Sequence, residues 1–193
     1  MRRASFMPSG HCAGPSGHRG YSLVELVMVM VIVGIIGVTV ASLLSSGVGA
    51  FAAGREAVDT LSELRLAGER IARELRTVRR DPGAPADFDF ITSTAVSGSS
   101  VQFRRLENDG STVTTVTIDT VGTDLRLAYT TPAGSYTLSE RLGSVTFAYL
   151  QQNGTTAATG DNDVAFVEIV LSLTDANGNI YPQRTRVALR NRQ

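Results

Sequence analysis

The chain has 193 residues, of which 42% are hydrophobic, and its formal net charge is zero. This length fits one modest domain with an appendage, and the balanced charge gives no sign of a nucleic-acid-binding face. The only cysteine, Cys12, and both histidines, His11 and His18, lie in the first twenty residues. Removal of that segment would exclude disulfides, Cys or His nucleophiles and most zinc sites. We therefore expect a protein that is not an enzyme and has no cofactor or metal.

The first predicted element is a membrane-spanning helix. Residues 26–44 are almost purely apolar, and no charged residue occurs between positions 26 and 54. A helix needs about 20 such residues to cross a bilayer. The preceding segment carries Arg2, Arg3 and Arg19 without any acid. The positive-inside tendency then places the N-terminus in the cytoplasm and residues 55–193 outside.

Glu25 stands at the edge of this apolar run and does not suit an ordinary anchor. A carboxylate near a membrane needs a partner, or it must reach towards the interface as a boundary residue. Cleavage after Gly20 would create a free amine at Tyr21, four residues before Glu25. The amine and the carboxylate could pair within one chain or between neighbours, and the start of a helix also favours negative charge.

The sequence GYSLVE at positions 20–25, followed at once by the apolar run, closely resembles the prepilin cleavage and methylation motif. Type IV pilins and type II secretion pseudopilins share this motif. The resemblance implies cleavage after Gly20 by a prepilin peptidase and N-methylation of Tyr21. It also implies that Glu25 guides docking onto the N-terminal amine of an adjacent subunit. Tyr21 replaces the more usual Phe, and the leader of residues 1–20 is longer than many. An ordinary secretory signal is the competing interpretation, but Glu25 and the lack of a clear A-x-A site weigh against it.

No proline occurs between Pro15 and Pro82, which predicts one helix from Tyr21 to about Arg79. Residues 21–45 would form its transmembrane half and residues 46–80 an amphipathic half. Three glycines near the membrane exit predict a kink or a melted turn there: Gly47, Gly49 and Gly54. An apolar stripe follows at Leu61, Leu64, Ile71, Leu75 and Val78. We expect this stripe to pack on a sheet, because a coiled-coil seam would need more heptads.

Charged residues of the amphipathic half suggest two weaker features. Glu69 and Arg73 stand at i, i+4, a spacing that allows an ion pair worth a few tenths of a kcal/mol. Four arginines cluster near the expected helix end: Arg73, Arg76, Arg79 and Arg80. A solvated helix C-terminus is the preferred interpretation of these arginines, and a docking patch is the alternative.

Residues 81–193 read as a small β-rich extracytoplasmic domain. Alternation of period two predicts strands at 99–106, 112–118, 124–130, 144–150, 164–173 and 184–190. No long helix interrupts them, so one antiparallel sheet packed on the helix is expected. The predicted fold class is therefore α+β and pilin-like, with a long N-terminal helix packed on a small antiparallel sheet.

Three segments of this region resemble J-type minor pseudopilins and PilW-like minor pilins: ERIARELR at 69–76, SVTFAYLQQNG at 144–154 and RTRVALRN at 184–191. The resemblance implies a minor subunit of a type II secretion pseudopilus or a type IV pilus. Its partners would be prepilin peptidase, other subunits through the N-terminal helix, and the inner membrane, without nucleic acid. The chain would span the inner membrane once, with a periplasmic C-terminal domain, before joining the fibre.

Other functions find less support in the sequence. Segments 161–163 and 175–179 resemble fragments of calcium loops, but an EF-hand loop starting at Asp175 would need Glu at the position of Arg186. Hairpin turns are the preferred interpretation, with calcium left open. A membrane-anchored extracytoplasmic binding module, such as an adhesin or DNA-uptake receptor, is the main alternative function. A secreted hydrolase would have to rely on carboxylates such as Asp161 and Asp163.

Overall fold

The computed structural model describes residues 20–189, so the predicted leader lies outside the described residues except for Gly20. The chain divides into two units, Met1–Gly49 and Ala50–Gln193. One helix, α1 (Leu23–Leu75), begins in the first unit and ends in the second, and seven strands follow it. This arrangement confirms the predicted α+β, pilin-like architecture, in which a long apolar N-terminal helix is followed by small antiparallel sheets.

In the first unit, α1 is an isolated apolar helix. All of its described side chains up to position 49 are exposed, among them Val31, Ile35 and Leu43. The helix runs without a break through Gly47, Gly49 and on through Gly54 in the second unit, so the expected melted turn is absent. Each glycine costs about 1 kcal/mol relative to alanine, which is too little to open a helix that continues on both sides.

In the second unit, α1 ends at Leu75 rather than at Arg79. The backbone after Leu75 pairs with a strand instead of continuing the helix. The Arg79 amide donates to the Arg104 carbonyl at 3.1 Å, and Val78 forms a bridge with Arg105. The helix therefore stops where the sheet offers its backbone other hydrogen-bond partners.

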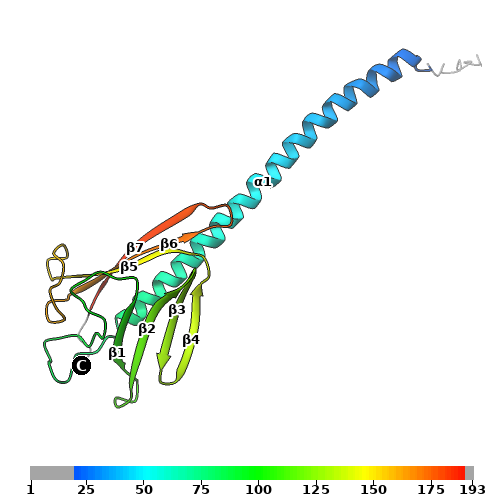
Figure 1. Cartoon of the computed structure of the whole chain (residues 1–193). Helices are drawn as coiled ribbons and strands as arrows, with labels where there is room; N and C mark the ends of the chain where they lie inside the picture. The colour runs from blue at the N-terminus through cyan, green and yellow to red at the C-terminus, as the bar shows by residue number, and fades with distance from the viewer. Residues whose placement is uncertain (1–19, 190–193) are drawn as a thin grey trace, which may run out of the picture. The chain divides into compact units, whose positions relative to one another are not determined.

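The strands form two antiparallel sheets rather than the single sheet expected (Figure 1). The four-stranded sheet has the order β1-β2-β3-β4, and the three-stranded sheet has the order β5-β6-β7. Their bounds are β1 (Val101–Leu106), β2 (Val113–Val121), β3 (Asp124–Thr130), β4 (Ala133–Ser139), β5 (Leu142–Leu150), β6 (Phe166–Thr174) and β7 (Ile180–Ala188). Strand β4 was not predicted, because its residues AGSYTLS are mostly small or polar and show no apolar alternation.

Both sheets share one hydrophobic core with the second-unit part of α1. The predicted helical stripe is buried at Leu64, Ile71, Leu75 and Val78, whereas Leu61 is 47% exposed. Their buried partners come from both sheets: Phe103, Ile118 and Leu127 from the first, and Phe147, Ile169 and Leu171 from the second. Burying each large apolar side chain contributes about 1.5–3 kcal/mol. The prediction that the stripe packs on a sheet is therefore confirmed, except at Leu61.

A charged contact links α1 to the connections of both sheets. Glu56 Oε1 accepts hydrogen bonds from Arg141 Nη1 at 2.5 Å and from the Ala176 amide at 3.3 Å. Arg141 lies between β4 and β5, and Ala176 lies in the turn between β6 and β7. The same Arg141 nitrogen donates to Thr60 Oγ1, whose residue is fully buried. One carboxylate oxygen thus holds two connections against the helix.

Candidate processing and assembly site

The residues of the predicted cleavage site form a short non-helical segment directly before α1. Gly20, Tyr21 and Ser22 are non-helical, and the helix begins at Leu23. The Leu26 amide donates to the Ser22 carbonyl at 3.1 Å. Ser22 therefore occupies the N-cap position, whose carbonyl accepts the first helical hydrogen bond.

The chain itself does not require glycine at position 20. A Cβ atom added to Gly20 would meet no atom within 4 Å, and Gly20 does not have a positive φ angle. Tyr21 is 81% exposed, so its side chain is not part of any core. Among residues 20–189, no other part of the chain therefore covers the Gly20–Tyr21 peptide bond.

Glu25 is exposed in the first turn of α1, where the helix dipole favours a negative charge. Its spacing from Ser22 fits a capping box, in which Glu at the third helical position bonds back to the N-cap amide. The side chain of Glu25 forms no hydrogen bond or ion pair among residues 20–189, so the capping box is not closed. Its carboxylate is available to a group outside the described chain.

The apolar part of α1 has the properties of a membrane span. It is the only helix among the described residues that is long and apolar enough to cross a bilayer. Polar groups in a bilayer must be satisfied internally. Thr39 Oγ1 donates to the Ile36 carbonyl at 2.8 Å, and Ser46 Oγ donates to the Ser42 carbonyl at 3.0 Å. These hydroxyls therefore need no water or partner chain.

Residues 15–48 match the family model of the prokaryotic N-terminal methylation motif. Gly20, Tyr21 and Glu25 all lie within the matched residues. No curated protein matches the chain. The match indicates a prepilin-type N-terminal segment, as in type IV pilin- or pseudopilin-like proteins, and suggests a structural subunit. It implies processing by prepilin peptidase and assembly with other pilins, and with the apolar helix it fits a single-pass inner-membrane anchor.

The second unit has a buried carboxylate, Glu74, that the sequence pattern did not single out. Glu74 is 3% exposed and accepts hydrogen bonds from Arg105 Nη1 and the Tyr129 hydroxyl, both at 2.8 Å. Arg70 Nη2 lies 3.0 Å from Glu74 Oε1, the oxygen that also accepts the Tyr129 hydroxyl. Burial, and then the hydrogen bond to Glu74, raise the pKa of Tyr129. Glu74 was detectable as an acid three residues after Ile71 on the buried stripe, but its distant partners were not.

The predicted arginine cluster does not form one patch. Arg79 Nη2 pairs with the buried carboxylate of Asp89 at 2.7 Å, and Arg80 stacks on the Phe88 ring at 3.9 Å. Arg73 and Arg76 are exposed. The Glu69–Arg73 pair is absent from the ion pairs of residues 20–189, which instead include Arg70–Glu74 on the same helix.

The two carboxylates considered for hydrolysis do not work as a pair. Asp161 accepts a hydrogen bond from Thr94 Oγ1, and the carboxylate of Asp163 accepts the Thr159 amide and Gln151 Nε2. Burial, and then repulsion from nearby carboxylates including Asp87, raise the pKa of Asp161. Hydrogen bonds from Thr159 lower the pKa of Asp163. Asp161 therefore binds the segment before β1 through Thr94, whereas Asp163 is used within its own loop.

The second predicted calcium-like segment is a hairpin turn. Asp175 Oδ1 accepts the Asn177 and Asn179 amides at 2.9 and 2.8 Å, and Oδ2 accepts the Tyr181 hydroxyl at 3.2 Å. Gly178 has a φ of 85°, a conformation that favours glycine. Within residues 20–189, no three Asp, Glu, His or Cys side chains are grouped so as to hold a metal ion.

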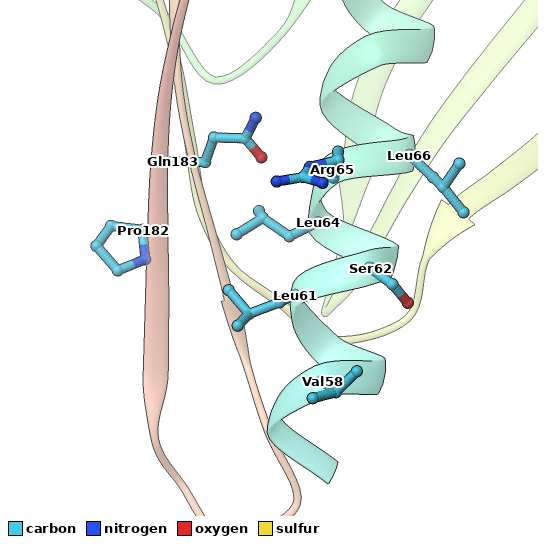
Figure 2. A pocket seen from close by; sticks show the side chains of 8 residues that line it. All are labelled: Val58, Leu61, Ser62, Leu64, Arg65, Leu66, Pro182 and Gln183. Atoms are coloured by element: carbon cyan, nitrogen blue, oxygen red, sulfur yellow. The ribbon is translucent and has the colours of Figure 1, made fainter. Parts of the chain in front are cut away.

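A hollow of about 670 Å³ lies between α1 and β7 (Figure 2). Its lining is mainly apolar: Val58, Leu61, Leu64, Leu66 and Pro182, together with Ser62, Arg65 and Gln183. Ser62 Oγ donates to the Asp59 carbonyl at 2.8 Å, as a helix hydroxyl commonly does. Arg65 is the one charged residue in this lining.

Proposed function

We propose that this chain is a minor pilin or pseudopilin, a structural subunit that prepilin peptidase cuts after Gly20 and that is then N-methylated at Tyr21. The processed subunit enters or primes a type II secretion pseudopilus or a type IV pilus. The observation that carries this proposal is the methylation motif across residues 15–48, which ends in a fully exposed apolar helix. The accessible Gly20–Tyr21 bond agrees with cleavage by an external enzyme.

Glu25 then acts in assembly rather than in folding. Its side chain is exposed and has no partner among residues 20–189. Cleavage would place a new amine at Tyr21, four residues away. In a fibre, the carboxylate of one subunit would pair with the amine of its neighbour, where the surrounding apolar helices strengthen the attraction between the two charges.

The minor class is supported by the resemblance of three segments to J-type pseudopilins and PilW-like pilins. Segment 69–76 includes the buried Glu74 and the end of α1, and segment 144–154 includes most of β5. Segment 184–191 begins in β7. The proposed orientation has a cytoplasmic N-terminus and a periplasmic second unit, because Arg2, Arg3 and Arg19 precede the apolar run without an acid among residues 1–20, whereas Arg55 follows it together with Glu56 and Asp59.

The test is intact mass and N-terminal sequencing of the membrane-extracted full chain, made with and without a prepilin peptidase. We expect a chain that begins at methylated Tyr21 only when the peptidase is present. Gly20→Val should block this cleavage, and Gly34→Val is the matched control, since a Cβ at either glycine meets no atom within 4 Å.

A chain that begins at Met1 in the presence of peptidase, or one cut beyond residue 44, would contradict the proposal. A membrane-anchored or secreted binding module would then be the remaining function, with the hollow beside β7 as its first candidate surface.

A further inference from the structure

The second unit contains two asparagine–glycine pairs, and the fold gives them different surroundings. Asn153–Gly154 follows β5, and Asn177–Gly178 lies in the turn between β6 and β7. Such a pair can react with itself, because glycine has no Cβ atom to keep its amide nitrogen away from the asparagine side chain. Both glycines have a positive φ, 70° for Gly154 and 85° for Gly178. Any difference in reactivity between the pairs must therefore come from the groups around them.

The first pair is held by its neighbours. Asn153 Oδ1 accepts hydrogen bonds from the Thr155 and Thr156 amides, both at 3.0 Å. Asn153 Nδ2 donates to Thr156 Oγ1 at 2.7 Å, so both ends of the side-chain amide are bound. Gly154 is buried, and a Cβ atom added to it would lie 3.2 Å from Arg186 Nη1. Neither a rotation of the asparagine side chain nor the approach of solvent to the glycine is easy here.

The second pair is open. Asn177 and Gly178 are both exposed, and a Cβ atom added to Gly178 would meet no atom within 4 Å. The side chain of Asn177 forms no hydrogen bond among residues 20–189, although its main-chain amide donates to Asp175 Oδ1 at 2.9 Å. The Gly178 amide donates to the Asp175 carbonyl at 3.0 Å, but the Gly154 amide is bound in the same way to the Gln151 carbonyl at 2.8 Å. The pairs therefore differ in the freedom of the asparagine side chain and in exposure to solvent.

We infer that Asn177 is a site of spontaneous deamidation in the folded protein, whereas Asn153 is protected. Hydroxide removes the proton of the Gly178 amide nitrogen, which then attacks Cγ of Asn177. A bond forms between these two atoms and the bond from Cγ to Nδ2 breaks. Nδ2 takes a proton from water, which regenerates hydroxide, and leaves as ammonia. Water then opens the cyclic imide at either carbonyl, giving aspartate or isoaspartate without any oxidation or reduction.

The reaction loosens the contact of this turn with α1. The Ala176 amide, next to the reacting residue, donates to Glu56 Oε1 at 3.3 Å. Isoaspartate adds one atom to the backbone of the turn, which the hydrogen bond from Gly178 to the Asp175 carbonyl closes. Both products also add a negative charge two residues from Asp175, and like charges repel. The modified turn therefore loses its hydrogen bond to Glu56.

The test is peptide mass spectrometry of the full chain, incubated in detergent in mildly alkaline buffer and compared with a sample taken at the start. A protease that cuts after glutamate separates the two pairs, because Glu168 lies between them. Asn177 should gain the mass of an amide-to-carboxylate change about tenfold faster than Asn153, whose side-chain hydrogen bonds must break first. Mildly acidic buffer should slow the reaction, because hydroxide is needed to activate the glycine nitrogen.

Two controls separate the effect of the fold from that of the dipeptide. In urea the two pairs should react at similar rates, because unfolding removes the contacts that protect Asn153. Asn177→Gln keeps an exposed amide but closes the ring far more slowly, so its Ala176 amide should keep its slow hydrogen exchange, which quickens in the reacted wild-type chain. Equal rates in the folded chain, or a rate difference that persists in urea, would overturn the inference. Equal loss of protection at Ala176 in incubated Asn177→Gln would overturn the link to Glu56.

Discussion

The buried carboxylate of Glu74 gives a sharp test of the contacts that hold α1 on the first sheet. We predict that Glu74→Gln destabilises the second unit although it preserves the shape of the side chain. The amide keeps one acceptor oxygen but removes the charge opposite Arg105 and Arg70, and it leaves the Tyr129 hydroxyl with a weaker acceptor. Hydrogen bonds to charged groups contribute about 1.5–3 kcal/mol, against about 0.5–1.5 for neutral ones.

The expected loss of stability follows from the ion pairs of Glu74 with Arg105 and Arg70. Arg105 is 21% exposed, so its ion pair contributes most of the loss. Arg70 is 41% exposed, so the contribution of its ion pair is reduced by solvent screening. The free energy of unfolding should fall by about 1.5–2 kcal/mol. For a unit of this size, that corresponds to a decrease in Tm of about 4–7 °C. Circular dichroism of the full chain in detergent, heated at fixed detergent concentration, measures this change.

The matched control is Glu69→Gln, in the preceding part of the same helix. Glu69 is exposed and has no ion pair in the described part of the chain, so its replacement should change the free energy of unfolding by less than about 0.5 kcal/mol. A double-mutant cycle with Arg105→Met should return a coupling of about 1 kcal/mol or more. Equal Tm values for the two glutamine variants, or a coupling near zero, would refute the reasoning.

Three further predictions concern the loops and the N-terminal site. Because the pKa of Asp161 is raised in the folded state, its ionised form opposes folding. Asp161→Asn should therefore raise the free energy of unfolding at pH 7, and this stabilisation should fade as the pH falls towards 4. Urea unfolding at several pH values measures the change. The pKa of Asp175 is lowered, first by the side chain of Asn179, so Asp175→Ala should reduce Tm at pH 7 and less so as the pH falls below about 4. Glu25→Gln should be cut after Gly20 as efficiently as wild type but should enter the fibre at least tenfold less, measured by mass spectrometry and by immunoblotting of sheared fibres.

The N-terminal half of the protein was predictable because its signals are local. Apolar character without interruption predicts the helix, and the spacing of Gly20 and Glu25 predicts the processing motif, which the family comparison supports. The period of the buried stripe also follows from residues three and four apart. The prediction that Leu61 is buried was wrong. The helix face at this position lies over the edge strand β7, where a hollow remains.

The second unit was less predictable because its determinants are distant in the sequence. The division into two sheets depends on which strands pair, and β4 lacks the apolar alternation that reveals a strand. The helix end at Leu75 is set by backbone pairing with Arg104 and Arg105. Apart from Arg70 on the same helix, Glu74 is satisfied by residues 31 and 55 positions away, and no local pattern could show those two partners.

The contacts of Glu56 determine how the second unit responds to mechanical force. Arg141 and the Ala176 amide meet at the same carboxylate oxygen; Arg141 lies in the connection that joins the two sheets, and Ala176 lies in the β6–β7 turn of the second sheet. A pull on α1 at this point therefore loads both connections at the same moment, as two bonds in parallel. We expect the two connections to resist traction together rather than to detach one after the other.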